Sequence, residues 1–126
     1  MSFVVLYKLI FMPASIIADK SYQFSIRIVK IHLHLCKTQK SIYGLSRQLL
    51  RAGTSIGANV HEAQNAESKI DFIHKFKIAA KEVEETKYWL ILCSNSKSYP
   101  LCEHLINALH EIDKIITKII STSKTN

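Results

Sequence analysis

The side chains best suited to chemistry in this sequence are its six histidines and three cysteines, but their spacing builds no recognisable active site. His32 and Cys36 are four residues apart, so on a helix they share a face and could bind one metal ion together. No second spaced pair supplies the other two ligands that a structural zinc ion needs. His61 and Glu62 are adjacent, and adjacent residues of a helix point in different directions. We therefore predict no metal site and no cofactor.

Familiar catalytic motifs are missing from the sequence. It has no Gly-rich phosphate loop, no Gly-x-Ser-x-Gly, no His-Glu-x-x-His and no EF-hand loop. A di-iron bundle needs Glu-x-x-His on two helices, and neither Glu62 nor Glu111 is followed by a histidine at that spacing. We expect no catalytic residues and a protein that is not an enzyme but acts by binding partners.

The elements that carry these residues are expected to be long helices. The 126 residues include only three glycines and two prolines, and 48% are apolar, which suits one domain of few elements with short loops. Apolar residues at three- and four-residue steps predict helices at about 17–37, at about 41–65, from Ser68 onward and from Pro100 onward. The predicted fold is all-α, an up-down-up-down antiparallel four-helix bundle.

The first three helices each carry one apolar stripe for the core. The stripes are Phe24, Ile28, Ile31 and Leu35; then Ile42, Leu45, Leu49, Ala52, Ile56, Val60 and Ala63; then Phe72, Phe76, Ala79, Val83, Thr86 and Leu90. Gly53 and Gly57 interrupt the second stripe. They predict either a close approach of another backbone, in a patch with Ser55 and Ala58, or a locally broken helix. Ser68 and Asp71 have the spacing of a capping box at the start of the third helix.

The fourth helix carries two apolar stripes, and a single packed face needs only one. The first is Leu101, Leu105, Ala108, Ile112, Ile115 and Ile119; the second is Ile106, Leu109, Ile116 and Ile120. The second stripe suggests burial against another copy of the chain.

The two ends are expected to lie outside the bundle. Residues 1–18 form an uncertain apolar segment, 19–122 the four-helix domain and 123–126 a polar tail, with fraying expected from Ser121. Phe3–Met12 is too short to span a membrane, and an extra packing segment, a tail and a targeting signal all stay open. Three widely spaced cysteines form no disulfide framework, which indicates a cytoplasmic protein.

Positive charge is concentrated in the first half of the chain. Of the net charge of +7, residues 1–63 contribute +6, from eight basic and two acidic side chains. Such a field attracts polyanions, although a basic surface can also serve solubility alone. Candidate nucleic-acid-binding residues are Arg27, Lys30, Lys37, Arg47 and Arg51.

A polar ribbon is expected along the second helix. It consists of Arg51, Ser55, Asn59, Glu62 and Asn65, at steps of four, four, three and three. It can be plain solvent-exposed surface or a polar network at a subunit interface. Arg51 is expected to pair with Glu62, or with Glu82 or Glu85 of the third helix.

Two long motifs carry a family resemblance. SRQLLRAGTSIGANVHEAQNAES at 46–68 and DFIHKFKIAAKEVEETKYWL at 71–90 resemble the 23S ribosomal RNA intervening-sequence proteins, and a looser likeness extends over about 19–120. Arg51, Ser55, Asn59 and Glu62 fall on that family's polar signature, whereas the segment up to Ala18 departs from it. The resemblance implies a homopentameric ring. In a related branch, the accessory proteins of diversity-generating retroelements, a basic pentamer binds RNA and a reverse transcriptase.

These observations lead to two functional hypotheses. The first is a non-catalytic homo-oligomer that binds RNA or a ribonucleoprotein through its basic surface. The alternative is a structural or adaptor protein that mediates protein–protein contacts and has no nucleic-acid role.

Overall fold

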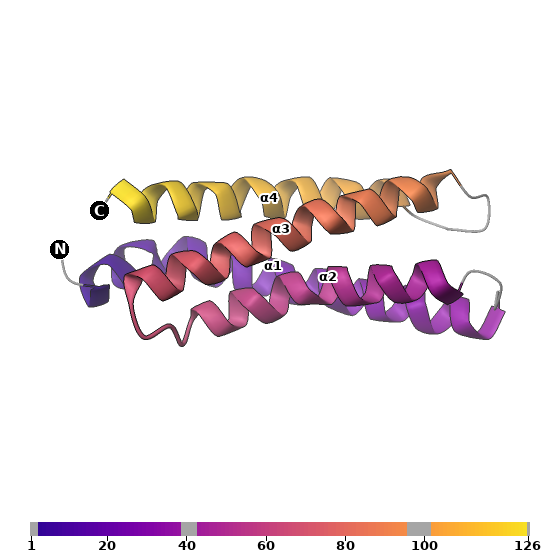
Figure 1. Cartoon of the computed structure of the whole chain (residues 1–126), viewed down its shortest axis with the longest axis horizontal. Coiled ribbons are helices and arrows are strands. Elements are labelled where there is room, and N and C mark those ends of the chain that lie inside the picture. Colours follow the sequence, from indigo (N-terminus) through magenta and orange to yellow (C-terminus); the bar gives the residue numbers. More distant parts are fainter. Residues whose placement is uncertain (1–2, 39–42, 96–101, 126) are drawn as a thin grey trace.

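The computed structural model describes residues 3–38, 43–95 and 102–125, and their regular elements are all α-helices. The helices are α1 (Phe3–Thr38), α2 (Tyr43–Ala63), α3 (Lys69–Ser94) and α4 (Cys102–Thr125). They lie side by side along the long axis of the molecule, with both chain ends at the same end of the bundle (Figure 1). α2 and α4 each pack against both α1 and α3, which places α1 and α3 at opposite corners. The all-α prediction and the four helices are confirmed.

One apolar core runs through the bundle. The predicted stripes of the first three helices supply most of it: Phe24, Ile28 and Leu35; Leu49, Ala52, Ile56, Val60 and Ala63; Phe72, Phe76, Ala79, Val83, Thr86 and Leu90 are all buried. Ile31 and Leu45 are partly buried against the same core. Ile42 lies outside the described residues. The three- and four-residue spacing therefore identified the inward faces of these helices.

The predicted start of the first helix, near Ile17, was wrong, because α1 begins well before this residue. The helix starts at Phe3 and continues through Pro13. Proline removes one backbone hydrogen bond from a helix, and here the helix continues on both sides of it. Ile17 is fully buried, and the Ser21 hydroxyl donates to the Ile17 carbonyl at 2.7 Å, which satisfies a buried polar group. Residues 3–18 and 19–38 thus form one continuous helix.

α2 is unbroken at both glycines, so the locally broken helix is excluded. A Cβ at Gly57 would lie 3.0 Å from Ser25 Oγ and 3.2 Å from the Ser21 carbonyl oxygen. A Cβ at Gly53 would meet only the Ile28 side chain, at 3.0 Å. The close approach predicted for this helix is therefore made by α1. α2 ends at Ala63, two residues before the predicted Asn65, in a turn whose amides bond carbonyls three residues back.

The start of α3 fulfils half of the predicted capping box. Ser68 is the N-cap, and its side chain accepts a hydrogen bond from the Asp71 amide at 3.0 Å. The Asp71 carboxylate, however, accepts from the amide of Glu67 at 3.3 Å rather than from Ser68. Both acceptors satisfy amides that the helix itself leaves unpaired.

The two stripes of α4 form one broad inward face, so they give no sign of self-association. Leu109 and Ile116 of the second stripe are fully buried, and Ile106 and Ile120 pack against the core. No large apolar side chain of α4 is exposed among those the structure describes. A helix that contacts two neighbours needs a wide apolar face, which explains the offset stripe.

The fraying expected from Ser121 onward was also wrong. α4 extends to Thr125, and Ser123 is completely buried, so this last turn packs into the bundle. Pro100, the predicted start of the fourth helix, and Leu101 lie outside the described residues. Within the described chain, none of the helices combines the length and apolar character needed to traverse a lipid bilayer.

Candidate functional site

A row of exposed basic side chains follows α1. Arg27, Lys30 and Lys37, with His34 between them, all face solvent. Arg27 lies in a groove between α1 and α4 of about 240 Å³, whose far wall includes Glu111. Glu111 pairs with Lys20 at 2.7 Å. Within the described residues, the three cations of this α1 basic stripe make no ion pair, so their charge is available to an anion.

Arg47 and Arg51 lie elsewhere, over α2. Both line a separate surface hollow of about 650 Å³, together with Gly44, Gln48 and Thr54. The five predicted nucleic-acid-binding residues are therefore divided between two helices: three lie on α1 and two on α2. Arg47 makes no ion pair among the described residues, whereas Arg51 does.

Arg51 ties α2 to α3. It donates a short hydrogen bond to Glu85, and its Nε and Nη2 lie 3.3 Å from the Gln48 side-chain oxygen. Trp89 Nε1 also donates to Glu85, at 3.2 Å. Hydrogen bonds from Arg51 and then Trp89 hold the pKa of Glu85 below its ordinary value. The predicted pairing with Glu85 is confirmed, and the pairing with Glu62 is not formed.

Glu82 lies beside this network, but its hydrogen bonding and the direction of its pKa shift differ from those of Glu85. Its Oε2 lies 3.8 Å from Arg51 Nη1, too far for a hydrogen bond, and it accepts none although it is shielded from solvent. Burial, followed by the nearby negative charge of Glu85, raises the pKa of Glu82. One arginine thus faces two carboxylates whose pKa values shift in opposite directions.

The rest of the polar ribbon forms hydrogen bonds within α2 and one contact with α3. The Ser55 hydroxyl donates to the Arg51 carbonyl at 2.7 Å, and the Asn59 amide donates to the Ser55 carbonyl at 2.8 Å. Glu62 accepts from Lys75 of α3 at 2.9 Å, and Asn65 is exposed beyond the end of α2. Within one copy the ribbon is a partly exposed surface with contacts to α3.

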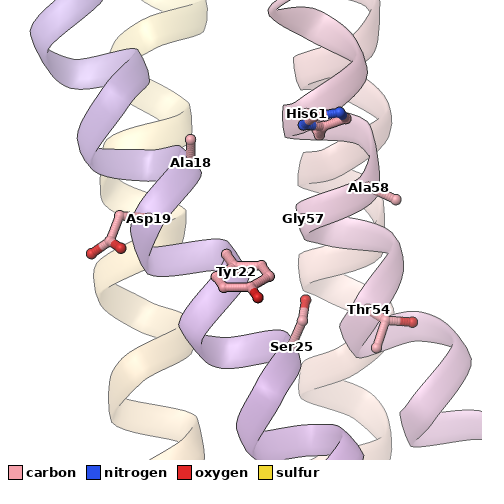
Figure 2. A pocket seen from close by; sticks show the side chains of 8 residues that line it. All are labelled: Ala18, Asp19, Tyr22, Ser25, Thr54, Gly57, Ala58 and His61. Carbon is pink, nitrogen blue, oxygen red and sulfur yellow. The ribbon is translucent and has the colours of Figure 1, made fainter.

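An apolar groove runs between α1 and α2 (Figure 2). It has a volume of about 570 Å³. Tyr22 and Ser25 of α1 face the turn of α2 that contains Gly57, and His61 lies farther along α2. Glu62 pairs with Lys75 of α3, whereas the adjacent His61 lines this groove on the side of α1. They therefore form no acid–base pair.

Two clusters of exposed apolar side chains escaped the sequence reasoning. The α1 apolar patch is Tyr22, Val29 and Leu33, and the α3 apolar patch is Tyr88, Ile91 and Leu92. Tyr22 and Leu33 are 63% and 55% exposed, and Tyr88 and Ile91 are 58% and 55% exposed. The patches occupy opposite corners of the bundle, because α1 and α3 do. The sequence does contain a signal for the α1 apolar patch, since residues 22, 29 and 33 form a second apolar stripe at helical spacing, on a different face from the core stripe.

His32 and Cys36 are brought together as their spacing predicted, with a third side chain from α2. Cys36 Sγ lies 3.4 Å from His32 Nε2, and His32 Nδ1 lies 2.7 Å from Ser46 Oγ. Serine is not a partner that completes a zinc site. Among the residues the structure describes, no three His, Cys, Asp or Glu side chains gather in a way that could hold a metal ion.

Fold and surface together define a four-helix bundle with a basic stripe on α1, an apolar groove between α1 and α2, and two exposed apolar patches. Residues 14–120 match the family described as 23S rRNA-intervening sequence protein, and the chain belongs to this family. Comparison with curated proteins gives no match.

A solved structure extends the comparison. It is the crystal structure of a protein with unknown function from the S23 ribosomal protein family of Bacteroides thetaiotaomicron. It is 42% identical to this chain, with a TM-score of 0.81, and the match covers 86% of this chain and 98% of that one.

Proposed function

We propose that this protein is a non-catalytic, cytoplasmic homo-oligomer that binds RNA or a ribonucleoprotein through the α1 basic stripe and Arg47. The observation that carries the proposal is the charge of residues 20–61, which contain seven Lys or Arg and no Asp or Glu. Arg27, Lys30, Lys37 and Arg47 come from this stretch and have no ion-pair partner within the described residues. Arg51 is compensated by Glu85, so we assign it to the α2–α3 contact rather than to RNA.

The proposed binding is tested by its dependence on salt. Replacing Arg27, Lys30 and Lys37 by glutamine removes the stripe, and the matched control replaces Lys69, Lys77 and Lys81 of α3. We expect filter binding to structured RNA at low salt for the parent and the control. The plot of log affinity against log salt should become shallower by about 2 in the stripe variant, since each lost phosphate contact removes about 0.7–0.9. Equal effects of the two triple variants, or no binding by the parent, would contradict the proposal.

The proposed assembly is a ring of up-down-up-down antiparallel bundles. The helix contacts and the shared position of the chain ends support that arrangement (Figure 1). Two unlike apolar patches at opposite corners suit a head-to-tail contact, in which the α1 patch of one copy covers the α3 patch of the next. Such contacts close into rings when the rotation permits. Five copies is the number implied by the family resemblance.

Two single variants test the head-to-tail contact by light scattering. Leu33→Lys damages the α1 apolar patch and Ile91→Lys the α3 apolar patch, while Ile70→Lys alters an exposed residue outside both. We expect each patch variant to be monomeric and the Ile70 control to keep the parent's mass. A mixture of the two patch variants should form a dimer and stop there, because one intact patch remains on each. A monomeric parent, or a full ring from the mixture, would rule out this contact.

A structural or adaptor protein remains the second candidate, and the exposed apolar patches favour it specifically. In that case one patch would receive another protein and the basic charge would be incidental. Pull-downs from lysate with and without nuclease separate the two functions. Loss of the partners after nuclease treatment supports RNA binding, and retention of the same partners supports the adaptor.

A further inference from the structure

Three side chains from two helices form a chain of contacts that the proposed function does not use. Cys36 and His32 are one turn apart on α1, with Sγ 3.4 Å from Nε2. The other ring nitrogen of His32, Nδ1, lies 2.7 Å from Ser46 Oγ of α2. Ser46 is 2% exposed, so its position is set by the packing of α2. A thiol, an imidazole and a fixed hydroxyl therefore follow one another in space.

The two nitrogens of a neutral imidazole have different roles, and the partner of one decides the role of the other. When Nδ1–H donates to Ser46 Oγ, Nε2 carries the lone pair and faces the thiol. This is the arrangement of a nucleophile, a base and a group that orients the base. Cys36 also differs from Cys93 in its exposure, since Cys93 is fully buried in the core and Cys36 is only partly buried.

We propose that Cys36 is a reactive thiol that forms a mixed disulfide with small anionic disulfides of the glutathione type. His32 Nε2 takes the thiol proton, and Sγ attacks one sulfur of the disulfide. A new S–S bond forms as the original one breaks, and the departing thiolate takes the proton from His32. Cys36 is oxidised while half of the disulfide is reduced to a thiol, so electrons balance. The excess positive charge of residues 20–61 favours an anionic reagent.

The proposal is tested with oxidised glutathione in the Cys102→Ser variant, so that only Cys36 and Cys93 can react. Intact mass and peptide mapping follow the adduct over time. We expect modification at Cys36 and none at Cys93, reversed by dithiothreitol. The rate constant should exceed that of the same thiol in urea by about tenfold. Reaction at Cys93 instead, or no advantage of the folded chain over the unfolded one, would overturn the proposal.

Variants of the two helper residues separate chemistry from packing. His32→Gln should lower the rate constant at Cys36 by about tenfold or more, whereas His34→Gln, on the same helix, should not. Ser46→Ala should lower it less, and Ser46→Thr, which keeps a hydroxyl, should restore it. Circular dichroism confirms that each variant is folded. An unchanged rate in His32→Gln would show that the imidazole does not act on the thiol.

Discussion

The contact between α1 and α2 differs in kind from the contacts that α3 makes with its neighbours. α1 approaches α2 through Gly57, where its own backbone fills the space of a missing side chain. α3 is joined to α2 by Arg51–Glu85 and Lys75–Glu62, and to α4 by Lys87–Asp113 at 3.0 Å. Between α1 and α2 the described residues form no ion pair. The helices of this bundle are therefore joined in two ways: α1 and α2 by close packing, and α3 and its two neighbours by packing together with ion pairs.

This difference separates the two surfaces by their electrostatics. Where α3 contacts its neighbours, cations and carboxylates form ion pairs and so compensate one another's charge. Where α1 and α2 meet, the chain has no carboxylates from residue 20 to 61. Lys20 and Arg51 pair with carboxylates outside this stretch, but Arg27, Lys30 and Lys37 form no ion pair among the described residues. The α1 basic stripe is therefore the better candidate for a polyanion.

The largest expected effect is at the glycine contact. Gly57→Val should destabilise the bundle by about 2–3 kcal/mol, because the new side chain meets the Ser21 carbonyl, which belongs to a helix backbone. Urea unfolding followed by circular dichroism measures the change. Gly53→Ala is the comparison and should cost less, since its methyl group meets the Ile28 side chain rather than a helix backbone and alanine gains about 1 kcal/mol of helix propensity. Equal losses at both positions would remove the special role of Gly57.

A smaller effect is expected at the charge-paired side. Glu85→Gln should cost about 0.5–1 kcal/mol at pH 7, a modest value because the pair is partly exposed. The pKa of Glu85 is lowered by folding, so its contribution is present above the unfolded pKa and is lost as pH falls through the folded one. The variant and parent should therefore converge in acid. Glu84→Gln, next to it and more exposed, is the matched control and should cost less.

Glu82→Gln should change stability in the opposite direction, by about 0.5 kcal/mol in favour of the folded state at pH 7. The pKa of Glu82 is raised by burial, so its contribution is complete below the unfolded pKa and is lost as pH rises through the folded one. Urea unfolding at several pH values measures how the free energy of unfolding depends on pH in the parent and in the variant. A loss of stability at pH 7 would mean that Glu82 is held by Arg51 as firmly as Glu85 is.

The smallest effect is expected at Lys75. Hydrogen bonding and charge from Glu62 raise the pKa of Lys75, so this pair is intact at neutral pH. It is solvent-exposed, and Lys75→Gln should have only a small cost at low salt and none near 1 M salt, where exposed charges are screened. Thermal unfolding at both salt concentrations, with Lys77→Gln as control, measures it. A loss that persists in high salt would point to packing by the lysine stem.

The inward faces of the helices could be predicted from sequence because burial follows the helical period, as Phe24 and Val83 illustrate. The second stripe of α4 was misread because periodicity does not tell how many neighbours a helix has. Ser123 was missed because a serine can be buried at the end of a helix whose other residues carry the burial energy. Pro13 likewise hid the true start of α1, since one missing hydrogen bond does not end a helix.

The candidate site was less predictable because it depends on how helices are rotated about one another. Arg51 and Glu85 could be paired in advance, since each lies on a continuous polar stripe of a neighbouring helix. The hollows that Arg27 and Arg47 line could not be predicted, because each hollow is formed by side chains that come together only in the fold. The contact of Ser46 with His32 joins two helices and leaves no periodic signal in either.

The Gly57 contact also limits how the chain can change by mutation. The nearer backbone atom is the carbonyl oxygen of Ser21, and every residue type has one. No substitution at position 21 can therefore compensate a larger side chain at position 57. Relief is available only at Ser25, whose hydroxyl is the other close atom, and only in part. Second-site suppressors of a Gly57 variant should accordingly be few. We therefore expect the residues at this contact between α1 and α2 to tolerate little change in sequence.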